Sequence, residues 1–134
     1  MKVVNEFLMN AFRAAPNCEW CRRRIFHGKA DAHHLFGRGF GGGHRLDVAL
    51  NLLSLCRLCH TEFHDGQIAR SDLLAVVAAR EKCLQPDLER ALYFLIALPK
   101  DLSPERLEDK LVEIGLAARV LVERSLEEAG LAAW

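Results

Sequence analysis

Two Cys-x-x-Cys pairs, Cys18/Cys21 and Cys56/Cys59, are the first groups in the chain whose type and spacing suggest chemistry. A gap of two residues lets both thiolates of a pair reach one tetrahedral zinc ion at about 2.3 Å. The 34 residues between Cys21 and Cys56 leave room for an inserted pair of strands. A redox-active pair or unliganded buried thiols are the alternatives, but two pairs together favour structural zinc.

Four histidines and an asparagine that could take part in chemistry lie inside or directly after this frame: His33, His34, Asn51, His60 and His64. His60 and His64 are four residues apart, so on a helix both imidazoles project from one face and can chelate one ion. A strand carrying His33 and His34 would pack against that helix if the cysteine pairs converge. Because Cys59 directly precedes His60, zinc ligation at Cys59 would also fix where the histidine helix begins.

The surrounding sequence predicts the elements that must position these groups. In order, they are a helix over 2–14, a turn or knuckle over 17–28, strands over 30–36 and 48–55, and a helix from about 57 to 65. Between the strands, residues 37–43 contain five glycines and are expected to form a loop. Gly66 is a plausible stop for the histidine helix.

Everything after Gly66 has helical character. We expect one helix capped by Ser71-Asp72 and running to about Leu84, and another from Pro86 through Leu98. A long helix then starts at Ser103-Pro104, and Gly115 and Gly130 weaken or bound it. Its apolar stripe consists of Leu107, Leu111, Ile114 and Leu121.

Together these pieces resemble the HNH nuclease family, which has the ββα-metal fold. The matching segments are Asp31–Leu35 and Asn51–His60, followed by His64 and framed by both cysteine pairs. They cover roughly residues 16–66, and the glycine-rich stretch is similar to the loop of phage-type members. The resemblance implies an α+β fold class: a small ββα-metal motif with a zinc knuckle, followed by an α-helical C-terminal tail. Residues 1–70 would form the N-terminal helix and the zinc-stabilised lobe. Residues 71–134 would pack on that lobe or mediate association.

The same resemblance implies metal-dependent hydrolysis of a phosphodiester, in a protein of phage or mobile-element type. His34 would be the general base, and Asn51 would brace the loop between the strands and so orient His34. His33, His60 and His64 would bind one catalytic divalent ion, besides the structural zinc of the cysteines. Three imidazoles favour Zn²⁺, Ni²⁺, Co²⁺ or Mn²⁺ over Mg²⁺, which prefers oxygen ligands.

The expected partner is nucleic acid, with double-stranded DNA, nicked or cleaved, as the leading substrate. Residues 1–70 carry ten basic and six acidic residues, and the rest of the chain carries eight and twelve. Arg38, Arg22 and Arg23 are either phosphate contacts or solvated arginines. The alternative function is a non-catalytic zinc module that binds nucleic acid or protein. The tail could also form a homodimer through residues 107–121.

The five cysteines are expected in a reducing, cytoplasmic setting. No secretory segment is recognisable at the N-terminus, and no apolar run of about 18 residues predicts a membrane span. Metal ligation is therefore the preferred interpretation of the paired cysteines, rather than oxidation. Cys83 is left over and is expected to be a small core residue.

Overall fold

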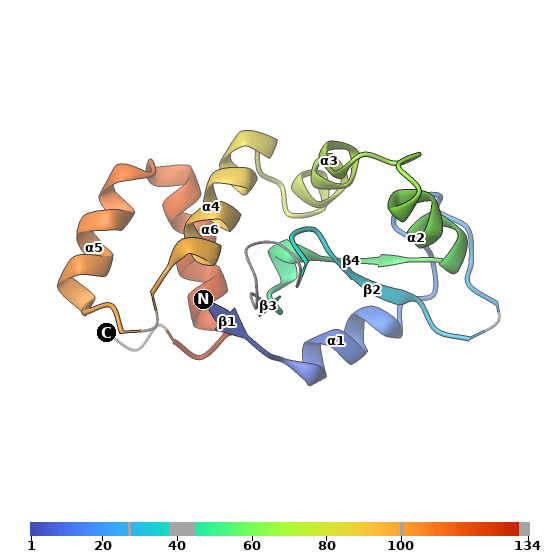
Figure 1. The fold of residues 1–134 in the computed structure, drawn as a ribbon, viewed down its shortest axis with the longest axis horizontal. Helices are drawn as coiled ribbons and strands as arrows, with labels where there is room; N and C mark the ends of the chain where they lie inside the picture. Colours follow the sequence, from blue (N-terminus) through green and yellow to red (C-terminus); the bar gives the residue numbers. More distant parts are fainter. Residues whose placement is uncertain (27, 38–44, 100, 132–134) are drawn as a thin grey trace.

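The computed structural model describes residues 1–26, 28–37, 45–99 and 101–131, and this part of the chain is a mixture of helices and small sheets (Figure 1). The strands are β1 (Lys2–Val3), β2 (Asp31–His34), β3 (Arg45–Leu46) and β4 (Leu52–Leu55). The helices are α1 (Glu6–Arg13), α2 (Arg57–His64), α3 (Arg70–Arg80), α4 (Gln85–Ala97), α5 (Pro104–Glu113) and α6 (Leu116–Glu128), with a 3-10 turn η1 (Ala49–Asn51). The predicted α+β character is confirmed.

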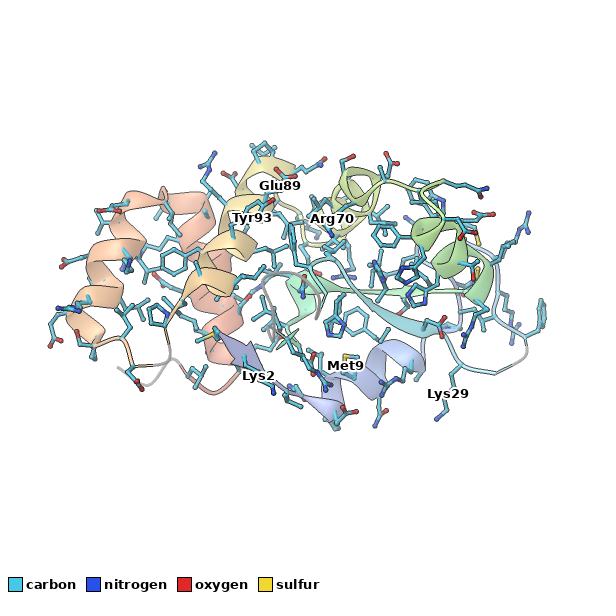
Figure 2. The ribbon with its side chains drawn as sticks, in the orientation of Figure 1. Lys2, Met9, Lys29, Arg70, Glu89 and Tyr93 are labelled. Atoms are coloured by element: carbon cyan, nitrogen blue, oxygen red, sulfur yellow. The ribbon has the colours of Figure 1, made fainter. Side chains whose placement is uncertain are left out.

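The central sheet is the antiparallel pair β2–β4, in which His33 lies opposite Leu53 and His34 opposite Leu52. Helices α1 and α2 both contact these two strands, and they lie on different sides of them in Figure 1. Met9, labelled in Figure 2, is the buried residue of α1. Because side chains alternate along a strand, β2 can present one set of groups to α2 and the other set to the α1 side.

Two local predictions in the first half are wrong in detail. The first residues of the helix predicted over 2–14 instead form strand β1, which pairs in parallel with β3. The helix itself begins only at Glu6. Asn5 caps α1 by accepting a hydrogen bond from the backbone N–H of Leu8 at 3.0 Å. The strand predicted over 48–55 starts late, because residues Ala49–Asn51 form the turn η1 before β4.

The helical tail also differs at its ends. Helix α3 begins at Arg70 and ends at Arg80, and Asp72 accepts a hydrogen bond from the backbone N–H of Ala69 instead of forming the predicted cap with Ser71. Ser103 caps α5 as predicted. The long helix predicted after it is divided in two at Gly115, whose φ of +89° lies in the left-handed region that favours glycine.

One buried apolar cluster runs through both halves of the described chain. It includes Leu35 and Leu53 near the central sheet and Leu92 and Val122 from α4 and α6. Helices α4, α5 and α6 gather at one end in Figure 1, and β2, β4 and α2 lie towards the other. None of the helices in the described part combines the length and the apolar character that crossing a membrane requires.

Candidate functional site

The four predicted zinc ligands converge. Each of Cys18, Cys21, Cys56 and Cys59 offers a sulfur atom, and these four atoms all lie within 4.8 Å of one another. The Cys21 and Cys56 sulfurs are 3.9 Å apart. Tetrahedral ligation at about 2.3 Å requires sulfur separations of roughly 3.8 Å, so the spacing fits one zinc ion. This cluster can hold a structural metal such as zinc.

Local backbone geometry shapes each half of the cysteine cluster. In the first half, Arg22 directly follows Cys21, has a φ of +66° and donates its backbone N–H to the carbonyl of Cys18 at 3.0 Å, which closes a turn that contains both cysteines. In the second half, Cys56 is the N-cap of α2, and its sulfur accepts the backbone N–H of Cys59 at 3.5 Å. The cysteine cluster and the start of α2 are therefore one unit.

The two halves of the cysteine cluster are tied to the central sheet by Glu19 and Ser54. The backbone N–H of Glu19 donates to the Ser54 carbonyl at 2.8 Å, and Glu19 Oε2 accepts the Ser54 N–H at 2.6 Å. Arg80 from α3 donates to Glu19 Oε1 at 2.8 Å and to the carbonyls of Ala49 and Leu52. These contacts hold β4 in register with the first knuckle.

Three histidines form a second cluster between β2 and α2. The ligand nitrogens of His33, His60 and His64 lie within 4.8 Å of one another. Nε2 of His60 and Nε2 of His64 are 3.1 Å apart, as their positions one helical turn apart predict. Nitrogens bound tetrahedrally at about 2.0–2.1 Å from one ion would be roughly 3.3 Å apart. The arrangement therefore fits three ligands of a single ion.

Asp31 orients one of these imidazoles. Its Oδ2 lies 2.9 Å from Nδ1 of His60, and its Oδ1 lies 3.3 Å from the guanidinium of Arg57. An ionised carboxylate only accepts hydrogen bonds, so the imidazole proton of His60 is on Nδ1 and the lone pair is on Nε2. Histidine ligands of metals commonly have such a carboxylate behind them.

His33 provides the least ordinary nitrogen of the histidine cluster. Its ring contacts Phe63 with ring centroids 4.5 Å apart, and its Nε2 is buried without a hydrogen-bond partner among the described residues. Such an orphaned group costs about 1–3 kcal/mol unless something binds it. Burial, together with the nearby His60 and His64, lowers the pKa of His33 to about 3. The ring is therefore neutral at physiological pH, and its lone pair is available to a metal.

His34 has a different environment from His33, because the two rings project from opposite faces of β2. Nε2 of His34 lies 2.7 Å from Oδ1 of Asp47, whose side chain is completely buried. Burial alone would raise the pKa of Asp47, but hydrogen bonds from Arg45, the backbone N–H of Asn5 and His34 outweigh it and lower that pKa. Arg45 also donates to Glu6 at 2.8 Å, which links the pair to α1.

Asn51 is fully buried and bonds to both flanks of the segment between β2 and β3. Its Oδ1 accepts the backbone N–H of Phe36 at 3.0 Å, and its Nδ2 donates to the carbonyls of Phe36 at 3.2 Å and Leu46 at 2.9 Å. Phe36 lies two residues after His34, and Leu46 directly precedes Asp47. Asn51 therefore fixes the backbone close to His34 on one flank and close to Asp47 on the other.

Two surface hollows adjoin the histidine cluster. The first has a volume of about 350 Å³, and its lining includes His33, His34, His64 and Arg70. The strand-end position of His33 and His34 thus allows rings on opposite faces of β2 to reach one hollow. The second has a volume of about 370 Å³, and its lining includes Arg13, Lys29, Asp31, Arg57 and His60. Figure 2 shows Arg70 and Lys29 on different sides of strands β2 and β4.

The three arginines predicted as phosphate contacts are not placed beside the histidine cluster by the described part of the structure. Arg22 and Arg23 are exposed on the first knuckle and line neither hollow. Arg38 lies outside the described residues.

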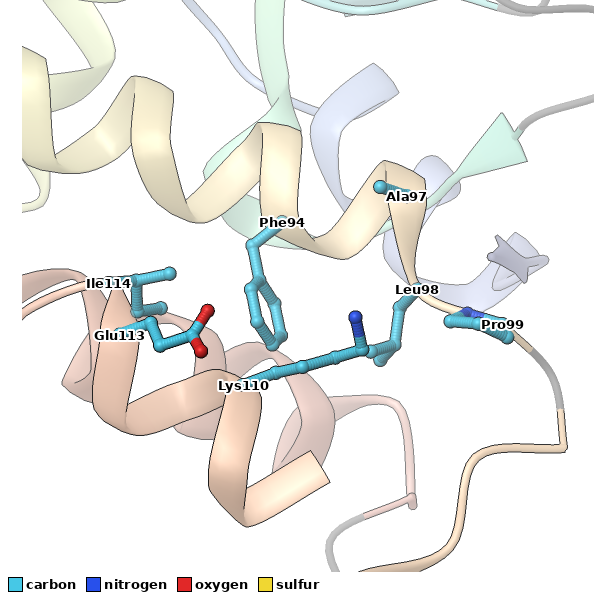
Figure 3. Close-up of a pocket in the computed structure, with 7 residues that line it drawn as sticks. All are labelled: Phe94, Ala97, Leu98, Pro99, Lys110, Glu113 and Ile114. Carbon is cyan, nitrogen blue, oxygen red and sulfur yellow. The ribbon is translucent and has the colours of Figure 1, made fainter. Parts of the chain in front are cut away.

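A separate hollow between α4 and α5, drawn in Figure 3, is lined by Phe94, Ala97, Leu98, Pro99, Lys110, Glu113 and Ile114. Its one lysine and one glutamate belong to neither metal cluster.

Sequence reasoning missed Asp47 and the basic residues of the second hollow, Arg13, Lys29 and Arg57. In the sequence, Asp47 is simply an acidic residue shortly before Asn51. No helical or strand spacing connects it to His34. Comparison with known proteins adds no further residue. No protein-family model matches the chain, and neither a curated protein nor a solved structure matches it.

Proposed function

We propose that the protein is a metal-dependent endonuclease of the HNH type, which hydrolyses phosphodiester bonds of nucleic acid, with double-stranded DNA as the leading substrate. The observation that carries the proposal is the convergence of His33, His60 and His64 to single-ion distances, with Nε2 of His33 buried and without a hydrogen-bond partner in the part of the chain that the structure describes. A fourth imidazole, that of His34, lines the same hollow as two of these rings, those of His33 and His64. Nuclease chemistry needs this combination of a cation and a nearby base.

The order of the elements supports a ββα-metal interpretation of this lobe. Strands β2 and β4 pair in antiparallel register, and α2 follows β4 directly with Cys56 as its N-cap. Two of the three imidazoles come from α2, and the third comes from β2. The cysteine cluster lies at the junction of β4 and α2, so it supports the base of the same motif.

In the proposed reaction, His34 accepts a proton from a water molecule while the oxygen of that water attacks the phosphorus of the scissile phosphodiester. The bond from phosphorus to the leaving oxygen then breaks. An imidazole with an unprotonated ring nitrogen suits this role. His33, His60 and His64 would hold the divalent ion, and the contact of Asp31 with Nδ1 of His60 would leave Nε2 free for that purpose. A divalent ion bound there supplies Lewis-acid stabilisation of the negative charge that develops on the phosphate and on the leaving oxygen.

The ligand set also limits the metal. Three neutral imidazoles favour Zn²⁺, Ni²⁺, Co²⁺ or Mn²⁺, whereas Mg²⁺ prefers oxygen ligands and retains its waters. We therefore expect activity with borderline transition metals to exceed activity with Mg²⁺.

The two hollows would accommodate the nucleic-acid backbone on either side of the histidine cluster. Lys29 and Arg57 line the second hollow, and the Arg57 side chain is 85% exposed. Each phosphate contact removed should lower the dependence of binding on salt by roughly one unit of slope. A double variant of Lys29→Ala and Arg57→Ala should therefore flatten the plot of log affinity for DNA against log salt. An unchanged slope would remove these two residues from the interface.

The direct test is incubation of the purified protein with supercoiled plasmid and a panel of divalent ions. Loss of a positioned general base costs about 10²–10⁴-fold in rate, so His34→Ala should bind metal normally yet cleave at least about a hundredfold more slowly. His60→Ala should lose both the ion and the activity. Metal-dependent cleavage that persists undiminished in His34→Ala would contradict the proposal and would point to a contaminating nuclease. Metal binding without any cleavage would favour a non-catalytic zinc module.

A further inference from the structure

We propose that Asp47 is a positioning residue for His34, which sets the tautomer of its imidazole; this inference rests on the proposed function. The Asp47 carboxylate lies 13 residues after His34, across the segment between β2 and β3. Its Oδ1 is 2.7 Å from Nε2 of His34, which is a short charge-assisted hydrogen bond. No metal ligand named above makes this contact.

The partners of Asp47 determine which atom carries the proton. Oδ2 of Asp47 accepts the backbone N–H of Asn5 at 2.8 Å, and Nε of Arg45 lies 3.0 Å from both oxygens. With these donors around a fully buried side chain, the carboxylate is held in its ionised form, which can only accept hydrogen bonds. The proton in the contact with His34 therefore belongs to Nε2 of the imidazole.

A proton on Nε2 leaves the lone pair of neutral His34 on Nδ1. A general base must present an unprotonated nitrogen, so the choice of tautomer decides which ring atom can accept the proton of water. Arg45 and Asn5 fix the carboxylate from its far side, and Asn51 fixes the backbone directly before Asp47 through Leu46. The imidazole is thus held in one tautomer and one orientation before substrate binds.

Replacing Asp47 with asparagine tests the tautomer without removing the side chain. The side-chain oxygen of the new residue should stay with the N–H of Asn5 and with Arg45, so its amide nitrogen would face Nε2 of His34. An amide nitrogen donates, which would force the imidazole proton onto Nδ1. A wrong tautomer in a comparable His–Asp pair costs about 10⁴-fold in rate, and we expect a loss of at least about 10²-fold here.

The primary readout is the tautomer itself, which long-range proton–nitrogen NMR correlation of ¹⁵N-histidine-labelled, zinc-loaded protein reports directly. His34→Gln identifies the His34 signals. Wild-type His34 should be protonated on Nε2, and Asp47→Asn should move the proton to Nδ1. The matched control is Glu6→Gln, which removes the negative charge that faces Arg45 at 2.8 Å but leaves the contact between Asp47 and His34. Its tautomer should be that of the wild type, with a cleavage rate within about twofold.

The outcomes separate this inference from the proposed function. If wild-type His34 carries its proton on Nδ1, the positioning role is refuted, even where Asp47→Asn fails to fold. Full cleavage activity in a folded Asp47→Asn variant would refute it as well. A wild-type protein with the Nε2 tautomer but without any nuclease activity would leave the Asp47–His34 geometry correct and would overturn the endonuclease proposal instead.

Discussion

Removal of the Asp31 carboxylate should weaken the histidine metal site without removing a ligand. Asp31 Oδ2 lies 2.9 Å from Nδ1 of His60, and both side chains are mostly buried, at 19% and 26% exposure. Carboxylates behind a histidine ligand typically contribute 10–100-fold in metal affinity, which corresponds to about 1.4–2.7 kcal/mol. Hydrogen bonds to charged groups contribute about 1.5–3 kcal/mol, so the two estimates agree. We therefore expect Asp31→Ala to bind the second ion 10–100-fold more weakly.

Arg57→Ala is the matched control for Asp31→Ala, because it removes the other partner of the same carboxylate. The Arg57 guanidinium lies 3.3 Å from Asp31 and is 85% exposed, so this pair should contribute at most about 1 kcal/mol. The assay is calorimetric titration of Zn²⁺ or Co²⁺ into protein whose cysteine cluster already holds zinc. His64→Ala identifies the heat that belongs to the histidine cluster. Equal affinities in Asp31→Ala and wild type, or an equal loss in Arg57→Ala, would refute the role of Asp31.

Three further predictions concern stability and metal content. Asn51→Asp places an oxygen against two backbone carbonyls that now accept from Nδ2, so we expect a loss of about 3 kcal/mol or more in the free energy of unfolding; an unchanged midpoint in urea would contradict this. Cys18→Ser should lose one zinc per chain by metal analysis and should unfold at lower temperature, whereas Cys83→Ser should keep its zinc; equal metal content in both variants would count against the cysteine cluster. The pKa of Asp47 is lowered from 3.8, so its ionised form stabilises the fold above about pH 4, and this contribution is lost as the pH falls through the folded-state pKa. The difference in unfolding free energy between wild type and Asp47→Asn should therefore shrink below pH 4, and a difference that is constant with pH would show that the charge is not responsible.

The sequence could predict those parts of the site whose residues lie a few positions apart on one helix, strand or turn. His60 and His64 share a helix face, and the period of two on β2 places Asp31 on the same face as His33. The Cys-x-x-Cys pairs predict convergence because tetrahedral ligation leaves few other arrangements for four thiolates. In each case the chemistry depends on a spacing of two to four residues, which local geometry translates directly into proximity.

Asp47 could not be found in this way, because its contact depends on pairing between distant segments. Strand β3, which precedes it, pairs in parallel with Lys2–Val3 at the start of the chain. The apolar residues at that start also fit the helical stripe of α1, so the sequence predicted a helix there. A two-residue strand has almost no pattern of its own, and tertiary pairing decides its conformation. The same dependence placed Asn5, the N-cap of α1, against the Asp47 carboxylate.

The cysteine cluster and the histidine cluster share helix α2, so the position of the cysteines affects the position of the histidines. Cys56 caps α2 and Cys59 lies in its first turn, so the thiolates determine where the helix begins and hence where His60 lies. An eight-residue helix is too short to be stable alone in water, and its position depends on the contacts at its ends. Zinc bound by the cysteines would therefore do more than stabilise the lobe, because we expect it to fix the rotation of α2 relative to His33 on β2. Without that ion, we expect His60 and His64 to lose their fixed position relative to His33 on β2.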